Sequence, residues 1–225
     1  MKNKELILSM IVALLTTTLV LIKIPQYEND GIKFKNEYEK LNNKDIGYNK
    51  DYLEMNIDKE NPMVYVEFDE LINIIKNDTA VIYFGFPECP WCRNAVPVLL
   101  DAAKELGIEK IYYYNAVSIR DKKSLDENGQ IVVEEEGTKE YKELVELLYD
   151  YLPVYDGLNN DEIKRLYLPT ILFVKDGKII GLHTSTVESQ KDPFTKLSNR
   201  QYEELKSIYF DYINKAFEIV CDEAC

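Results

Sequence analysis

The pattern of apolar and polar positions divides the chain into three parts. An uncharged, mostly apolar run covers residues 6–22, inside a first segment that we place at 1–25. Residues 26–61 are polar and charged, which is typical of a linker, and apolar positions at helical spacing over 34–41 predict a short helix within it. From residue 62 onward short apolar runs alternate with helical spacing, so we expect one folded domain over 62–225.

The folded region alternates between strand and helix signals. Continuous apolar or β-branched runs predict strands, and apolar residues three or four apart predict helices. The predicted strands are 64–68, 80–86, 110–117, 170–174 and 179–183, and the predicted helices are 69–76, 90–106, 138–151 and 198–220. A turn over 175–178 joins the last two strands into a hairpin. This order of elements predicts an α/β domain.

The apolar first segment favours a membrane anchor. Its length is near the short limit for a membrane-spanning helix, about 17–25 residues, and exceeds the apolar part of most signal peptides, about 7–15 residues. No small-residue cleavage pattern follows it, so we expect 1–25 to be an uncleaved signal-anchor, with a cleaved signal peptide as the alternative. Lys2 and Lys4 favour a cytoplasmic N-terminus. The domain would then lie outside the cytoplasm as a single-pass protein of the cell membrane, or be secreted after cleavage.

The charge balance excludes nucleic acid as an expected partner. The sequence has 27 Lys and Arg against 40 Asp and Glu, a formal net charge of −13. Such acidity repels polyphosphates, and the sequence holds no run of basic residues with interleaved aromatic rings. The abundance of Lys, Asn, Ile and Tyr is typical of an AT-rich genome and indicates a bacterial source.

The strongest chemical signal is a pair of cysteines two residues apart. Cys89 and Cys92 lie where a predicted buried strand meets the predicted helix 90–106, and Pro90 suits the first helical turn. The helix N-terminus favours the thiolate of Cys89, the form that attacks disulfides. A redox-active pair is therefore the leading interpretation, and a structural disulfide or half of a zinc site are the alternatives. Trp91 between them either stacks on a substrate or fills the corner of the motif.

A second feature is a proline at the entry of a predicted buried strand. Leu168-Pro169 precedes 170–174, and a proline in such a place usually marks a special turn, often with a cis peptide bond. On both motifs, the region 63–220 resembles the thioredoxin superfamily. The resemblance implies a thioredoxin-like fold with a central mixed sheet flanked by helices, and an insertion at about 119–165 before the cis-proline strand.

The resemblance also implies an activity and its residues. The protein would be a thiol–disulfide oxidoreductase without a cofactor, in which Cys89 attacks the substrate disulfide and Cys92 resolves the mixed disulfide. Pro169 would be the cis-proline that supports the substrate backbone, with Leu168 before it. The partners would be protein thiols and disulfides and a redox partner. More narrowly, residues 83–93 are similar to membrane-anchored thioredoxin-like proteins related to bacteriocin-accessory disulfide enzymes.

The sequence also departs from the family. Thioredoxin has a buried Asp six positions before the first cysteine, and this chain has Tyr83 there. Glu88 would raise the pKa of the first thiol and Arg93 would lower it, so reductase, oxidase and isomerase activities all stay open. A non-catalytic adaptor with a structural disulfide and a cytoplasm-facing reductase are the alternative functions.

A second cysteine pair, Cys221 and Cys225, lies at the end of the sequence. On a helical end their Cα atoms would be about 6 Å apart, which is within disulfide range. A structural disulfide, free thiols and an auxiliary redox pair that exchanges with Cys89 and Cys92 are all compatible with this spacing. The single histidine, His183, is interpreted as structural, and we predict no metal site.

Overall fold

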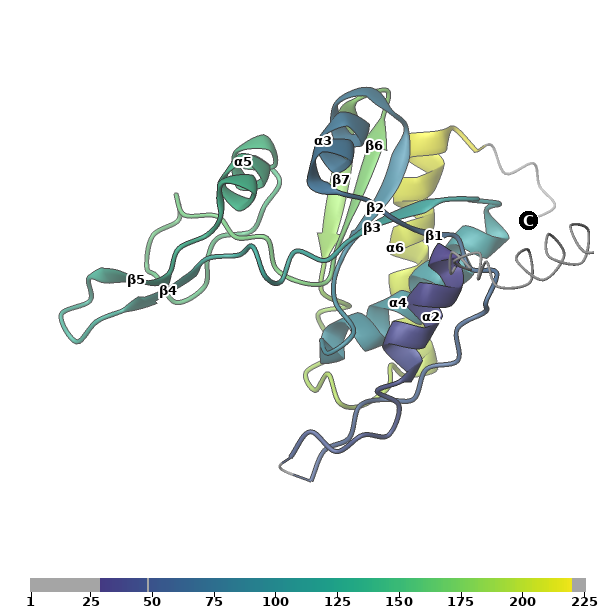
Figure 1. Cartoon of the computed structure of the whole chain (residues 1–225), viewed down its shortest axis with the longest axis horizontal. Helices are drawn as coiled ribbons and strands as arrows, with labels where there is room; N and C mark the ends of the chain where they lie inside the picture. Colours follow the sequence, from purple (N-terminus) through teal and green to yellow (C-terminus); the bar gives the residue numbers. More distant parts are fainter. Residues whose placement is uncertain (1–28, 48, 220–225) are drawn as a thin grey trace, which may run out of the picture.

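A five-stranded mixed sheet forms the centre of the structure, a computed structural model that describes residues 29–47 and 49–219 (Figure 1). The strand order is β1-β3-β2-β6-β7, with β1, β3 and β2 parallel to one another and β6 and β7 antiparallel to their neighbours. The strands of this sheet are β1 (Met63–Tyr65), β2 (Ala80–Phe84), β3 (Ile111–Tyr114), β6 (Thr170–Lys175) and β7 (Lys178–Thr184). The helices are α2 (Asp30–Glu39), α3 (Phe68–Asn77), α4 (Pro90–Glu105), α5 (Lys139–Leu147) and α6 (Asn199–Phe217).

Both faces of the sheet are covered by helices. Successive residues of β2 point to opposite faces, because side chains alternate along a strand. Tyr83 packs with α2, α4 and α6 on one face, whereas Ile82 and Phe84 pack with α3 and α5 on the other (Figure 1). All five residues of β2 are buried, which explains the continuous apolar run in the sequence. The predicted sheet flanked by helices is confirmed.

The ends of several elements differ from the sequence prediction. The strand predicted over 64–68 ends at Tyr65, since Phe68 already begins α3 and packs with its apolar face. The helix predicted over 138–151 ends at Leu147, and a turn follows. A capping box between Ser198 and Gln201 begins α6.

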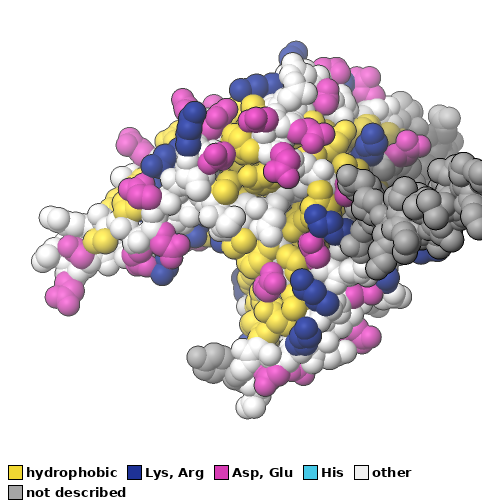
Figure 2. All heavy atoms as spheres, viewed as in Figure 1, with side chains coloured by type: hydrophobic (Ala, Val, Ile, Leu, Met, Phe, Trp, Pro, Cys, Tyr) yellow, Lys and Arg dark blue, Asp and Glu magenta, His cyan; other side chains and the backbone are white. Residues whose placement is uncertain are grey.

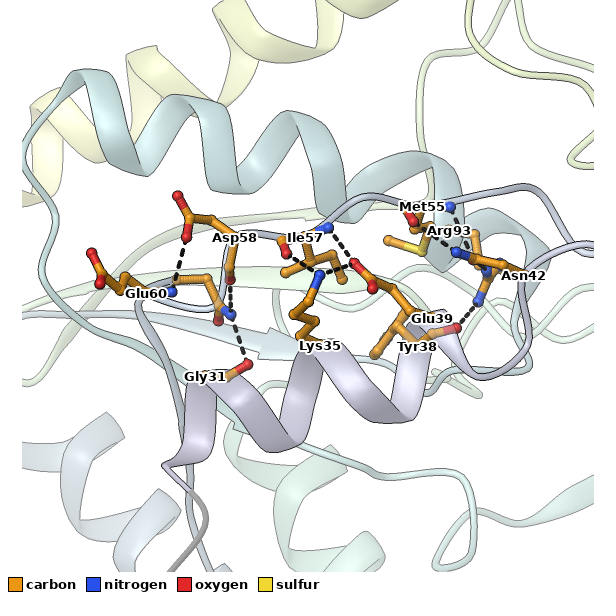
Figure 3. Close-up of polar contacts among 11 residues, drawn as sticks. Gly31, Lys35, Tyr38, Glu39, Asn42, Met55, Ile57, Asp58, Glu60 and Arg93 are labelled. Atoms are coloured by element: carbon orange, nitrogen blue, oxygen red, sulfur yellow. Dashed lines mark hydrogen bonds and ion pairs between the residues drawn. The ribbon is translucent and has the colours of Figure 1, made fainter.

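The helix predicted inside the polar stretch is α2, and it belongs to the core. Phe34 and Tyr38 are fully buried against the sheet. Figure 3 shows how the chain that follows the helix runs back along it, with Lys35 donating a hydrogen bond to the Ile57 carbonyl at 2.7 Å. The polar character of this stretch therefore reflects its outer surface, while two aromatic rings hold it to the domain.

The insertion between β3 and β6 carries a hairpin that forms a separate arm, whereas its helix α5 packs on the sheet. Its hairpin consists of β4 (Lys122–Leu125) and β5 (Ile131–Glu135), joined by residues 126–130, and α5 follows. The hairpin projects away from the sheet (Figure 1), and hydrophobic side chains reach the surface along it (Figure 2). Val132 and Val133, at 41% and 44% exposed, belong to this surface.

Two sequence predictions fall outside the described residues: the signal-anchor at 1–25 and the pair Cys221 and Cys225. Among the helices of residues 29–47 and 49–219, none combines the length and the apolar character that a bilayer crossing requires.

Candidate redox site

Cys89 and Cys92 stand at the start of α4, directly after the central strand β2. Cys89 is the N-cap of the helix, and its sulfur accepts a hydrogen bond from the backbone N–H of Cys92 at 3.2 Å. Pro90 follows at the first helical position, where a missing N–H leaves no bond unmade. Both cysteines are free thiols; Cys89 is 4% exposed and Cys92 is fully buried. The first cysteine thus keeps a small exposed surface, and the second has none.

Several contacts lower the pKa of the Cys89 thiol from its ordinary value of 9.0. The largest is a hydrogen bond from the Cys92 thiol, which outweighs the opposing effect of burial. Backbone N–H groups of Cys92 and Trp91 at the helix N-terminus also lower the pKa, as does the positive charge of Arg120. The N–H groups of the helix start therefore favour a thiolate at Cys89, as the sequence indicated, but they contribute less than the Cys92 thiol, which the sequence did not indicate as a cause.

Cys92 has the opposite electrostatics. Complete burial raises the pKa of its thiol well above 9.0, and the hydrogen bond and charge of Cys89 raise it further. A hydrogen bond with the Tyr83 hydroxyl lowers the pKa of Cys92, although less than burial raises it. The pair consequently holds one sulfur as the better nucleophile and the other as a protonated thiol.

A cis peptide bond between Leu168 and Pro169 lies beside the cysteines. Phe84 at the end of β2 pairs with Thr170 at the start of β6, so the two loops that carry the cysteines and the proline are neighbours. The Cys89 thiol donates a hydrogen bond to the Leu168 carbonyl oxygen at 3.6 Å. The structure therefore combines a mixed sheet, a Cys-x-x-Cys pair at a helix start and a cis-proline next to that pair.

The fold is thioredoxin-like. Within this thioredoxin-like fold, Trp91 is half-buried and packs, like Leu168, against the core cluster that contains both cysteines. The structure thus brings together Cys89, Cys92, Leu168 and Pro169, with Trp91 at the border of the cluster.

Arg93 does not point at the thiols, contrary to the expectation that it lowers the pKa of Cys89. Its guanidinium donates to the Leu53 carbonyl at 2.9 and 2.6 Å. It also donates to the Tyr38 carbonyl at 2.9 Å and to the Asn42 side chain at 2.6 Å (Figure 3). The side chain is 2% exposed. The arginine that acts on Cys89 is Arg120, which comes from the insertion. Nothing local in the sequence distinguishes these two arginines.

A pair of buried tyrosines lies on the core side of Cys92. The hydroxyl groups of Tyr38 and Tyr83 are 2.7 Å apart, and both residues are fully buried. Tyr83 can turn its phenol under the active-site loop because position 85 is glycine, where any Cβ would overlap the Tyr83 hydroxyl. The sequence marked Tyr83 only as a departure from thioredoxin, and no signal pointed to Tyr38 as its partner.

The remaining residues to place are the single histidine, His183, and any cluster of metal-ligating side chains. His183 lies in β7, where its Nε2 is 2.9 Å from the Thr186 carbonyl oxygen and burial lowers its pKa. Over the described ranges, no three His, Cys, Asp or Glu side chains gather closely enough to hold a metal ion.

Comparison with known proteins gives one kind of match. No family model and no curated protein matches the chain. Among solved structures, the chain is similar to thioredoxin O2 from Arabidopsis thaliana in its oxidized state, with 15% sequence identity, a TM-score of 0.34, and coverage of 66% of this chain and 96% of that chain.

Proposed function

We propose that the protein is a thiol–disulfide oxidoreductase that acts on cysteines of other proteins. The observation that carries the proposal is the asymmetry of the pair. The pKa of Cys89 is lowered at a helix N-terminus, next to a cis-proline, while Cys92 is buried and its pKa is raised. A structural disulfide needs no such difference between its two sulfurs, whereas a nucleophile and its resolving partner do.

The reduction of a substrate disulfide takes two steps. In the first, the Cys89 thiolate attacks one substrate sulfur, a mixed disulfide forms, and the other substrate sulfur leaves as a thiolate. In the second, Cys92 loses its proton and attacks Cys89, the Cys89–Cys92 bond forms, and the mixed disulfide breaks. The pair loses two electrons and two protons, and the two substrate sulfurs gain them. The reverse sequence oxidises a substrate dithiol.

The substrate chain lies, in this proposal, along the loop that carries the cis-proline. The Leu168 carbonyl is within hydrogen-bond distance of Cys89, so backbone bound next to Pro169 is close to the attacking sulfur. Trp91 adds a half-buried aromatic surface at the same place, where it can contact an apolar substrate side chain.

The exchange of disulfides with insulin tests this function. The full-length chain, reduced with dithiothreitol, is expected to reduce insulin, and Cys89→Ser abolishes the activity. Cys92→Ser keeps the first step but accumulates a mixed disulfide on Cys89, which mass spectrometry of the trapped complex detects. A parent chain without exchange activity, and with a Cys89 thiol that is alkylated only near its ordinary pKa, would identify a non-catalytic adaptor instead.

The tail cysteines are proposed to form a structural disulfide of their own. A chain with Cys221→Ser and Cys225→Ser then keeps its activity on insulin. A mixed disulfide between Cys89 and either tail cysteine in a trapped variant would instead identify an auxiliary redox pair.

We also propose that the domain lies outside the cytoplasm, tethered by residues 1–25, as in the membrane-anchored proteins that residues 83–93 resemble. The apolar run and the lysines before it support this arrangement. A membrane-impermeant thiol reagent should label Cys89 in intact cells, and the chain should remain in the membrane fraction. Labelling only after permeabilisation would identify a cytoplasm-facing reductase, and release into the medium would identify a cleaved signal peptide.

A further inference from the structure

In the resolving step Cys92 has to carry a negative charge, which its buried surroundings disfavour. Cys92 is fully buried, and it has to become a thiolate before it can attack the mixed disulfide. Burial in an apolar core destabilises that charge. Among the described residues, the other titratable groups that act on Cys92 are Cys89, Tyr38, Tyr113, Tyr209 and Arg120, and of these only Arg120 carries a positive charge. A neutral hydrogen-bond donor is the other kind of group that can help, and a bond of this kind has the largest lowering effect on the pKa of Cys92.

The Tyr83 hydroxyl is such a donor. Burial raises the pKa of Tyr83 and of Tyr38 well above 10, so both phenols stay protonated and neither can take the proton of Cys92. Their hydroxyls are 2.7 Å apart in a fully buried pair. When Tyr38 donates to Tyr83, the Tyr83 proton is free to point at the Cys92 sulfur. This chain of two hydroxyls strengthens the final bond, because hydrogen bonds in series polarise one another.

The contacts of Arg93 hold the backbone of Tyr38, the second residue of the tyrosine pair. Arg93 follows Cys92 on α4, and it donates to the Tyr38 carbonyl at 2.9 Å (Figure 3). The helix that carries the sulfur thus also holds the backbone of the residue whose side chain aligns Tyr83. Gly85 in the loop leaves the room that the Tyr83 phenol occupies.

We propose that Tyr83 is a catalytic residue of the resolving step, donating its hydroxyl proton in a hydrogen bond to the Cys92 thiolate, and that Tyr38 is the residue that positions it. This inference rests on the proposed function and adds a role for α2 in it. In the step, the Cys92 sulfur bonds to Cys89, the bond from Cys89 to the substrate sulfur breaks, and the electron pair leaves with that sulfur. The proton of Cys92 ends on the departing substrate thiolate, and the tyrosines keep theirs.

A two-phase reaction with an aromatic disulfide reagent separates the two steps. In a chain with Cys221→Ser and Cys225→Ser, the first release of the coloured thiolate reports attack by Cys89, and the second reports resolution by Cys92. We expect Tyr83→Phe to slow the second release about tenfold at neutral pH, because a hydrogen bond to a charged group is lost, and to move its pH profile upward. Tyr38→Phe shifts the same phase in the same direction by a smaller factor. The first release keeps its rate in both variants.

Tyr209→Phe is the matched control. Tyr209 is also fully buried in the cluster of Cys92, and within the described part of the chain its hydroxyl has no hydrogen-bond partner. Its removal should leave both phases unchanged. A second readout uses a chain in which Cys92 is the only cysteine, where Tyr83→Phe should raise the pKa of the thiol and Tyr209→Phe should not.

The outcomes distinguish this inference from the function on which it rests. A parent chain with no first release refutes the oxidoreductase. A parent with both phases, and Tyr83→Phe with an unchanged second phase and an unchanged pKa of Cys92, refutes only the role of the tyrosines. If Tyr83→Phe does not fold, Tyr38→Phe decides the question in the same assay, since it removes the hydroxyl that aligns Tyr83.

Discussion

Arg93 offers a sharp test of how the segment around α2 is held. Replacement by Met keeps an unbranched side chain of similar length and removes every N–H donor. The Leu53 carbonyl then loses the two hydrogen bonds that Arg93 supplies, at 2.9 and 2.6 Å. The Tyr38 carbonyl keeps one donor, the N–H of Leu41 at 3.2 Å, and the Asn42 oxygen keeps the N–H of Met55 at 2.9 Å.

The expected cost follows from these contacts. The loss of both donors at the partly buried Leu53 carbonyl costs about 1–2 kcal/mol, and the lost bonds at Tyr38 and Asn42 add about 1 kcal/mol each. Part of this is offset, because a buried guanidinium carries a desolvation penalty that lowers the pKa of Arg93 and that Met does not have. We expect Arg93→Met to lower the free energy of unfolding by about 2–4 kcal/mol.

Equilibrium unfolding in urea measures the change. The midpoint should fall while the slope with denaturant stays the same, because the same surface is exposed on unfolding. Arg200→Met on the exposed start of α6 is the control, with an expected change within about 0.5 kcal/mol. If Arg93→Met and Arg200→Met had equal effects, the carbonyl contacts would contribute nothing measurable and the reasoning would be wrong.

Three further predictions concern the redox site. The rate of alkylation of Cys89 should rise with pH and reach half of its plateau below pH 9.0, because a lowered pKa gives thiolate at lower pH. Cys92, whose pKa is raised, should react only at higher pH. Peptide mass spectrometry after timed quenching separates the two cysteines. Arg120→Gln should move the Cys89 midpoint upward in the same experiment, because a positive charge near the thiolate is removed, and an unmoved midpoint would exclude Arg120 from the site's electrostatics. Gly85→Ala should cost about 1–3 kcal/mol in urea unfolding, since its methyl group overlaps the Tyr83 hydroxyl in a packed core; an unchanged midpoint would mean that the phenol can move aside.

Local patterns were sufficient for the parts of the fold that depend on neighbours in sequence. The buried run of β2, the start of α4 at Pro90 and the turn between β6 and β7 each follow from a few adjacent residues. The peptide bond before Pro169 was expected to be cis because a proline enters a buried strand, and it is. Element ends were less accurate, since helix and strand signals overlap around Phe68.

The network around the cysteines could not be predicted, because its partners are far apart in sequence. Tyr38 and Tyr83 are separated by 45 positions, and Arg93 and Leu53 by 40. A single sequence contains no information about which buried hydroxyl or carbonyl will meet which donor. Hydropathy also underrated α2, whose outward face is charged although Phe34 and Tyr38 are fully buried.

The burial of α2 determines where this protein can be shortened for expression. A version that begins at β1 would lack the oxygen atoms of Tyr38, Asn42 and Leu53 that accept hydrogen bonds from Arg93. The Arg93 guanidinium would then keep only its hydrogen bond to the Pro87 carbonyl, at 3.3 Å. Such a fragment would carry an unsatisfied cation and a hydrophobic cleft in place of two aromatic rings, and it should aggregate. A version that begins before Asn29, the N-cap of α2, keeps the helix whole.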